Sequence, residues 1–249
     1  MKAFLLAAGI GSRLKPYTDT IPKCLIPIHG KPLLHIWLEL LARHGIKDVL
    51  INIHHYPEKV DEFITGIQPT LPINITPFHE QTLLGSAGTI AANQAFVNDC
   101  DDFMIAYADN LTCINLSNMM DFHHRIKTKG GFFTMGLFKS ANPRECGIAV
   151  MDPENKIVKF IEKPQNPLGN LANGGIYITT REIFSFIPKP TGAPIDMGFD
   201  VIPALMGKMF GYEIKEYLRD IGTPASYQAA LDEWPQRDLL KRLTCSEEK

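Results

Sequence analysis

The sequence predicts an α/β protein built on a doubly wound, mostly parallel sheet. Short apolar runs that suit strands alternate with segments of helical periodicity through the first half of the chain. A glycine-rich turn follows the first of these runs, and Asp109 follows the fourth. Because ligands of such sheets bind at the carboxyl ends of the strands, we expect the glycine turn and Asp109 to share one ligand site.

The first half alternates strands and helices in a regular order. The first strand is a short continuous apolar run, as expected in a sheet covered on both faces. The four expected strands follow in order along the chain. They are placed at residues 3–8, 49–53, 73–77 and 103–106. The helices carry apolar residues three and four positions apart. They are placed at residues 32–44, 57–64 and 86–95.

The second half predicts a smaller, mixed β part. Residues 147–151 and 156–162 flank the turn sequence Asp152-Pro153-Glu154-Asn155 and are expected to form a hairpin. The other expected elements are strands at residues 131–138 and 173–178 and helices at residues 199–209 and 224–233.

Size and composition exclude several kinds of protein. The 249 residues suffice for one large α/β domain, and a hydrophobic fraction of 45% is ordinary for a soluble globular protein. A net charge of −2 provides no basic surface for nucleic acid or an anionic membrane. No apolar run approaches the ~18–20 residues of a membrane span. We expect no nucleic-acid and no membrane partner, and the sequence leaves open whether the chain forms a homo-oligomer.

Cysteine and histidine spacing gives no metal or redox motif. The five cysteines include no closely spaced pair, which predicts reduced thiols in a cytoplasmic protein. Cys24 is expected to be a small buried residue. His123 and His124 have no further ligands at metal spacing, so we expect a histidine pair on a helix surface.

The turn Gly9-Ile10-Gly11 follows the first expected strand, where phosphate-binding loops lie. Glycine lets the backbone approach an anion closely and present N–H groups to it. The dinucleotide fingerprint is excluded because it needs a third glycine where Leu14 stands, and the Gly-Lys-Ser/Thr of a P-loop is missing. Arg13 and Lys23 add a guanidinium fork and an ammonium charge for phosphate oxygens. Together these residues predict a phosphate-binding site.

The sequence resembles the sugar-1-phosphate nucleotidylyltransferases through motifs that follow one another over roughly residues 1–230. The segments that carry the resemblance are Leu6-Ala7-Ala8-Gly9-Ile10-Gly11-Ser12-Arg13-Leu14 with Pro22-Lys23, Leu84-Gly85-Ser86-Ala87-Gly88, Asp109, Glu162-Lys163-Pro164, Asn173-Gly174-Gly175-Ile176-Tyr177 and Asp220-Ile221-Gly222-Thr223-Pro224. Within the family, the mannose-1-phosphate guanylyltransferases look most similar, through Glu80 with the 84–88 segment.

The resemblance implies a Rossmann-like nucleotidyltransferase fold in a single domain at residues 1–243. A nucleotide-binding half would span residues 1–115, and a half that binds the sugar phosphate would span residues 116–243. The polar tail at residues 244–249 is expected to be frayed.

Residue roles also follow from the resemblance. Arg13 and Lys23 would be catalytic, holding the nucleotide phosphates and stabilising the transition state. Asp109 and Asp220 would hold Mg²⁺, a hard cation suited to carboxylate and phosphate oxygens. The nucleotide-binding residues would be Leu6, Ala7, Ala8, Gly9, Gly11, Ser12, Glu80, Gly85, Ser86 and Gly88. The residues that bind the sugar phosphate would be Asn110, Gly147, Glu162, Lys163, Asn173 and Asp196.

The implied reaction transfers a nucleoside monophosphate from an NTP to a sugar 1-phosphate, which releases pyrophosphate and forms an NDP-sugar. The attacking phosphate is already ionised at neutral pH, because its second pKa is about 6, so no general base is needed. Repulsion between the two anions is the obstacle, and bound cations offset it. The expected pair is GTP with mannose 1-phosphate or a related hexose or heptose 1-phosphate.

Other functions stay open at the level of sequence. A uridylyl- or thymidylyltransferase acting on glucose 1-phosphate or an amino-sugar 1-phosphate would carry the same motifs. A metal-dependent glycosyltransferase usually has Asp-x-Asp at a strand end, whereas Tyr107-Ala108-Asp109-Asn110 supplies one carboxylate. A non-catalytic regulatory subunit typically loses the charged residues that this chain keeps.

Overall fold

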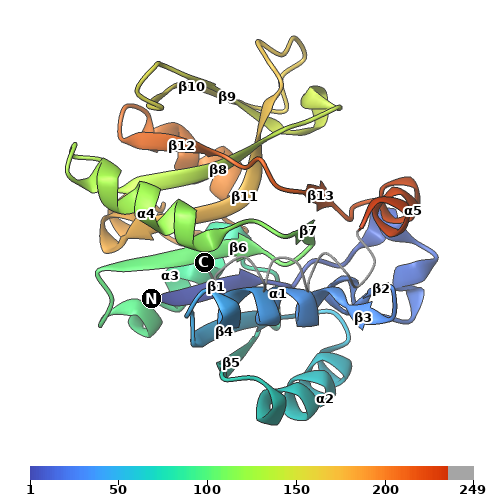
Figure 1. Ribbon diagram of the computed structural model, residues 1–249. Helices are drawn as coiled ribbons and strands as arrows, with labels where there is room; N and C mark the ends of the chain where they lie inside the picture. The colour runs from blue at the N-terminus through green and yellow to red at the C-terminus, as the bar shows by residue number, and fades with distance from the viewer. Residues whose placement is uncertain (235–249) are drawn as a thin grey trace, which may run out of the picture.

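The computed structural model describes residues 1–234 of the chain, so the expected tail at 244–249 and the last part of the 1–243 domain lie outside the described residues. A nine-stranded sheet runs through the whole of this part and is flanked by helices (Figure 1). Its strand order is β10-β9-β11-β6-β1-β4-β5, with β8 and β12 attached beside β11. One sheet therefore joins the two expected halves.

The parallel region of the sheet is formed by the first half of the chain, as predicted. Its strands are β1 (Lys2–Leu6), β4 (Asp48–Ile53), β5 (Asn74–His79) and β6 (Asp102–Tyr107). β1 lies between β4 and β6 and is parallel to both, and β5 is parallel to β4. The helices that connect these strands are α1 (Leu33–Arg43), α2 (Pro57–Ile67) and α3 (Ser86–Ala92). α3 ends before the predicted residue 95, and a 3₁₀ turn (Gln94–Val97) follows it.

The second half adds the mixed β part. Its strands are β8 (Phe133–Lys139), β9 (Gly147–Met151), β10 (Ile157–Glu162), β11 (Leu171–Thr180) and β12 (Met209–Glu213). β9 and β10 form the predicted antiparallel hairpin, and β11 runs antiparallel to β6. Short two-stranded sheets pair β2 (Pro27–Ile28) with β3 (Lys31–Pro32) and β7 (Asn110–Thr112) with β13 (Leu218–Asp220).

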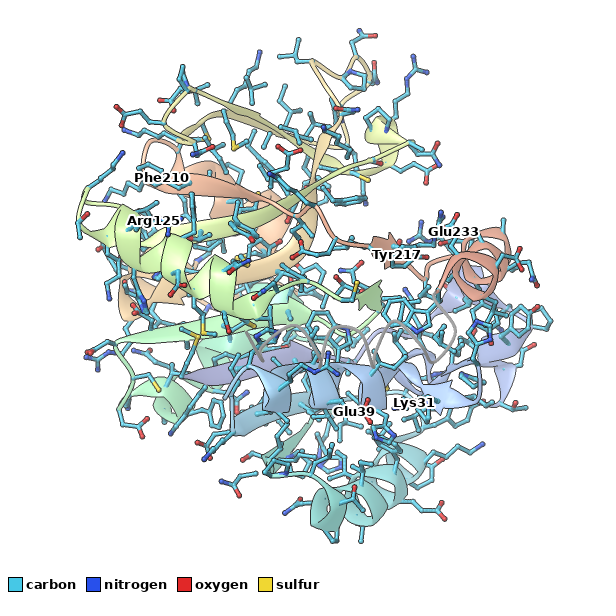
Figure 2. All side chains as sticks on the ribbon, viewed as in Figure 1. Lys31, Glu39, Arg125, Phe210, Tyr217 and Glu233 are labelled. Atoms are coloured by element: carbon cyan, nitrogen blue, oxygen red, sulfur yellow. The ribbon has the colours of Figure 1, made fainter. Side chains whose placement is uncertain are left out.

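Hydrophobic cores cover both faces of the sheet, which is the doubly wound arrangement predicted from the sequence. Ala3 and Leu5 of β1 belong to the core under α1, α2 and α4 (Leu116–Lys127), whereas Phe4 points into the core under α3. This alternation follows from the twofold repeat of a strand. At the surface, Lys31 pairs with Glu39 at 2.7 Å (Figure 2). Arg219 pairs with Glu233 at 2.6 Å and links β13 to α5 (Pro224–Glu233).

The helix predicted at residues 199–209 is confirmed only in part, because the segment does not form one continuous helix. A π-helical turn (Met197–Val201) and a 3₁₀ turn (Ile202–Leu205) occupy this segment, and β12 begins at Met209. Pro203 cannot donate a backbone hydrogen bond, so a regular helix is interrupted there. Within the described residues, no helix is long and apolar enough to cross a membrane.

The expectation of two histidines on a helix surface is wrong for His123 and confirmed for His124. α4 carries both residues, but His123 is fully buried while His124 is exposed. His123 faces the sheet, where its Nδ1 lies 2.9 Å from the Thr134 hydroxyl of β8 and its Nε2 lies 3.5 Å from Asp102. Burial lowers the pKa of His123 to about 4, so the ring is neutral at pH 7.

Candidate active site

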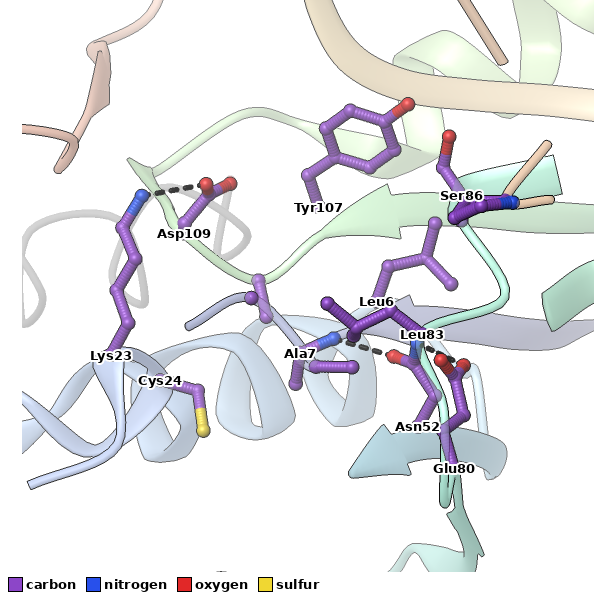
Figure 3. Close-up of a pocket in the computed structure, with 15 residues that line it drawn as sticks. Leu6, Ala7, Lys23, Cys24, Asn52, Glu80, Leu83, Ser86, Tyr107 and Asp109 are labelled. Carbon is purple, nitrogen blue, oxygen red and sulfur yellow. Dashed lines mark hydrogen bonds and ion pairs between the residues drawn. The ribbon is translucent and has the colours of Figure 1, made fainter. Parts of the chain in front are cut away.

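A cavity of about 310 Å³ opens at the carboxyl ends of the parallel strands (Figure 3). This is where a doubly wound sheet binds its ligands. The residues that line it are Leu6, Ala7, Ala8, Gly9, Lys23, Cys24, Asn52, Glu80, Leu83, Gly85, Ser86, Tyr107, Ala108, Asp109 and Pro194. Segments from β1, β4, β5 and β6 therefore meet around one space.

One end of the cavity is charged. Lys23 Nζ lies 2.7 Å from Asp109 Oδ2 and 3.5 Å from Asp220 Oδ1 (Figure 3 shows the Asp109 pair). Asp109 follows β6, and the pairing of β13 with β7 sets Asp220 opposite Asn110. The carboxylates of Asp109 and Asp220 outweigh the effect of burial, which by itself lowers the pKa of Lys23, and raise that pKa overall. Lys23 is therefore an ammonium at neutral pH.

The two carboxylates at this end suit a hard cation. Within residues 1–234, no group of three or more His, Cys, Asp or Glu side chains is placed to hold a metal ion. Asp109 and Asp220 therefore form an incomplete ligand set. Mg²⁺ is commonly held by one or two carboxylates together with substrate phosphates and water. The donor chemistry at this end of the cavity fits that ion.

The glycine turn reaches the charged end from β1. Gly11 has a φ of 71°, and a Cβ there would lie 2.8 Å from the Thr18 side chain and 3.2 Å from Lys23 Cβ. The Gly11 carbonyl accepts hydrogen bonds from Leu14 N–H at 2.9 Å and the Thr18 hydroxyl at 2.8 Å. Arg13 is exposed on the 3₁₀ turn that follows (Ser12–Leu14), and its charge acts on Asp220. The turn thus brings Arg13 and Lys23 to one region.

The other end of the cavity holds a buried network of uncharged donors around Glu80. Asn52 Oδ1 accepts from Ala7 N–H at 2.7 Å, and Asn52 Nδ2 donates to Glu80 Oε1 at 2.8 Å (Figure 3). The Thr89 hydroxyl also donates to Glu80 Oε1, and Leu84 N–H donates to Oε2 at 3.0 Å. This network joins the ends of β1, β4 and β5 to α3.

The 84–88 segment is hydrogen-bonded to Ile195 and Asp196, which precede the π-helical turn. Ala87 N–H donates to Ile195 O at 2.9 Å, and Ile195 N–H donates to Leu84 O at 2.8 Å. Gly85 has a φ of 80°, and a Cβ there would lie 2.7 Å from Ile195 N. The Ser86 hydroxyl donates to Asp196 Oδ2 at 3.1 Å. The close approach of these two backbones requires a glycine at position 85.

Glu162 and Lys163 lie at the end of β10, between Gly147 and the π-helical turn. A Cβ at Gly147 or Gly198 would collide with Glu162 Oε2, so both positions leave room for this carboxylate. Burial raises the pKa of Glu162, against the charge of Lys163 and with a contribution from Asp196. Lys163 Nζ lies 5.7 Å from the Phe199 ring centroid.

Polar side chains predicted to bind the sugar phosphate also hold the local backbone. The Asn110 side chain donates to Gly174 O at 3.0 Å. Asn173 Oδ1 accepts from Gly175 N–H at 3.0 Å. Asp196 Oδ1 accepts from Gly198 N–H at 2.7 Å and begins the π-helical turn. Their expected contacts with the sugar phosphate stay predictions.

Sequence reasoning missed Asn52, Thr89 and Tyr107 near the cavity. Asn52 was recognisable in principle, because it is a polar residue inside the apolar strand run at 49–53. Thr89 lies one turn after Gly85 and gives no separate signal. Cys24 is buried as predicted and lines the cavity, and burial raises the pKa of its thiol to about 12. The thiol is therefore protonated and gives no thiolate near neutral pH.

Comparison with known sequences identifies relatives over most of the chain. A sequence model of the family described as Nucleotidyl transferase matches residues 2–237. The mannose-1-phosphate guanylyltransferase catalytic subunit beta of Dictyostelium discoideum is 29% identical over 93% of this chain and 64% of its own length. A UTP–glucose-1-phosphate uridylyltransferase of Synechocystis is 34% identical over 83% of this chain and 55% of its own length. The chain thus spans less than two thirds of these relatives.

Comparison with solved structures agrees on the fold. A Bacillus anthracis protein described provisionally as a glucose-1-phosphate thymidylyltransferase superimposes with a TM-score of 0.82. The match covers 93% of this chain and 94% of that one, at 24% sequence identity. The arrangement of strands and helices is therefore shared.

Proposed function

This chain belongs to the nucleotidyl transferase family, and we propose that it transfers a nucleoside monophosphate from an NTP to a sugar 1-phosphate. An oxygen of the sugar phosphate attacks the α-phosphorus, and the bond from that phosphorus to the bridging oxygen of the β-phosphate breaks. The products are an NDP-sugar and pyrophosphate. The observation that carries the proposal is the meeting of Lys23, Asp109 and Asp220 at the charged end of the cavity, beside the glycine turn.

The charged end supplies what this reaction needs. The attacking phosphate is ionised at neutral pH, so the site has to overcome repulsion and stabilise the leaving pyrophosphate. Lys23 is held as an ammonium in the cavity wall, and Arg13 lies exposed in the turn, where its charge acts on Asp220. In this proposal both cations bind phosphate oxygens, and the backbone at Gly9 and Gly11 lies against the same phosphates.

Mg²⁺ completes the proposed site. Asp109 and Asp220 would hold it, and the substrate's phosphate oxygens would supply further ligands. When bound, the ion supplies positive charge to the phosphates, which lowers the cost of bringing two anions together. The Lys23 side chain lies between the same carboxylates and would keep the phosphates in line with them.

We propose GTP as the nucleotide. Among residues 1–234, Glu80 Oε2 accepts from Leu84 N–H, which leaves one of its two acceptor directions for a ligand in the cavity. Guanine presents N–H donors on one edge, and one of them can donate to the free acceptor direction of Glu80 Oε2. The guanylyltransferase relative supports the same choice. Mannose 1-phosphate or a related hexose or heptose 1-phosphate is the proposed acceptor, with Glu162 and Lys163 beside it.

UTP with glucose 1-phosphate is the second candidate. The Synechocystis uridylyltransferase is 34% identical to this chain, so sequence similarity supports both nucleotides.

We further propose that the reaction takes place in the cytoplasm. In support, the cysteines of the described part, Cys24, Cys100, Cys113 and Cys146, are free thiols, as in reducing compartments.

The test is a matrix of four NTPs against a panel of sugar 1-phosphates, scored for pyrophosphate release with Mg²⁺. We expect the highest kcat/KM for GTP with mannose 1-phosphate. A maximum with UTP and glucose 1-phosphate would replace the substrate pair but keep the reaction. Release of NDP from an NDP-sugar, with no pyrophosphate from any pair, would overturn the proposal in favour of a glycosyltransferase. If neither assay detected product, the chain would be a non-catalytic subunit.

A further inference from the structure

Asn52 is the polar residue of β4 whose role the proposed reaction leaves unexplained. It lies in a strand whose neighbours Ile51 and Ile53 are buried, and it is itself only 4% exposed. A buried amide is costly unless its donors and acceptors are satisfied. Asn52 meets this requirement with partners from three separate segments, and it lines the cavity.

Two hydrogen bonds of Asn52 fix groups that line the cavity, Ala7 and Glu80. Its Oδ1 accepts from Ala7 N–H at 2.7 Å, which sets the first residue after β1. Its Nδ2 donates to Glu80 Oε1 at 2.8 Å and lies 3.2 Å from the Thr89 hydroxyl. That hydroxyl donates to the same Glu80 oxygen. Asn52 and Thr89 together occupy Oε1, and this determines how Oε2 is presented.

We propose that Asn52, assisted by Thr89, is a positioning residue that sets nucleobase selection by holding the Glu80 carboxylate in one orientation. The inference rests on the proposed function in one respect, namely that the nucleobase lies in this cavity. With Oε1 occupied by protein donors, Oε2 alone faces the base. A base with matching N–H donors is favoured, and one with an acceptor there is rejected. Without Asn52 the carboxylate can turn, so the preference among bases declines.

The experiment measures dissociation constants of GTP, UTP, ATP and CTP by calorimetry with no sugar phosphate present. The readout is the ratio between the preferred nucleotide and the other three. Asn52→Leu removes both hydrogen-bonding groups at similar volume, and we expect the ratio to fall about tenfold. Thr89→Val removes one donor to Glu80 while keeping the shape, and we expect a fall of about threefold.

The chain offers a matched control in Thr134→Val. Thr134 is as fully buried as Thr89 and hydrogen bonds to one side chain, His123, away from the cavity. Both threonine variants lose a buried hydroxyl, so both are expected to lose stability, but only Thr89→Val should change base selection. Should Asn52→Leu fail to fold, the threonine pair still decides the question.

Unchanged ratios in Asn52→Leu or Thr89→Val would overturn the inference, as would a wild-type protein that binds all four nucleotides equally or binds none. Binding is measured without turnover, so the two proposals fail separately. A protein that selects a base through Asn52 but releases no pyrophosphate would refute the proposed reaction alone. A protein that turns over GTP with unchanged selection in both variants would refute the inference alone.

Discussion

Glu80, at one end of the cavity, is 6% exposed, whereas at the other end the side chains of Asp109 and Asp220 are 38% and 52% exposed. Glu80 is held by uncharged donors from the protein, and breaking those hydrogen bonds leaves buried groups unpaired. The exposed carboxylates are held by one ammonium, and water or a ligand can replace it. The Glu80 end, where we propose that the base binds, is therefore formed before a ligand arrives, whereas the charged end can exchange its partners for the proposed phosphate and metal.

The largest expected effect tests the charged end. Asp109→Asn removes one of the carboxylates proposed to hold Mg²⁺, and we expect kcat/KM for pyrophosphate release to fall about 10³-fold. Because the side chain is partly exposed, the melting temperature should change little. Asp19→Asn is the control, since Asp19 pairs with Lys15 in an exposed turn away from the carboxylates. Equal activity of the two variants would remove Asp109 from the metal site.

Lys23→Met is expected to lower kcat/KM by about 10²-fold, because the phosphates lose a preorganised cation. It should also free Asp109 and Asp220 from their partner, so Mn²⁺, followed by electron paramagnetic resonance without nucleotide, should bind more tightly than to the wild type. Lys15→Met is the matched control. If Lys23→Met and the wild type bound Mn²⁺ alike, the two carboxylates would not share the lysine and the metal.

Gly85→Ala tests, through stability, how firmly the Glu80 end of the cavity is formed. At the φ of 80° that Gly85 adopts, alanine is less favourable than glycine by about 1 kcal/mol. The clash of its Cβ with the Ile195 backbone adds about 2 kcal/mol. We expect the free energy of unfolding in urea to fall by about 3 kcal/mol. Gly45→Ala is the control, because Gly45 has a φ of 73° but its Cβ would meet nothing within 4 Å. If Gly85→Ala and Gly45→Ala lowered the free energy of unfolding equally, the 84–88 segment would not be packed closely against the Ile195 backbone.

The smallest effect concerns His123, a buried polar group outside the cavity. Burial lowers its pKa to about 4, so the unfolded chain binds the proton more readily between pH 6.5 and 4. The neutral ring therefore contributes its full stabilisation above pH 6.5. As the pH falls, the free energy of unfolding decreases, by about 2 kcal/mol at pH 5. Urea unfolding at pH 7.5 and pH 5 should show this loss in the wild type and in His124→Gln, but less of it in His123→Gln. The same loss in all three proteins would assign it to other groups.

Local patterns predicted most of the parallel region because each element there depends on its own residues. β1 and α1 follow from a continuous apolar run and from helical spacing, and the β9–β10 hairpin follows from its turn sequence. The prediction of one helix at residues 199–209 was only partly correct, because Pro203 and the capping residue Asp196 favour two short helical turns. The prediction of an exposed His123 was wrong because its surroundings include Thr134 and Asp102, which lie on other elements.

The sequence by itself determined the glycine turn, the cations next to it and the order of the motifs, because these depend on neighbours along the chain. The need for glycine at position 11, for example, arises from Thr18, seven residues away. Only the tertiary structure decided which groups meet. Lys23 and Asp220 are 197 residues apart and are joined because β13 pairs with β7. Asn52 gains its place beside Glu80 because parallel strands end at one edge of the sheet, where side chains distant in sequence become neighbours.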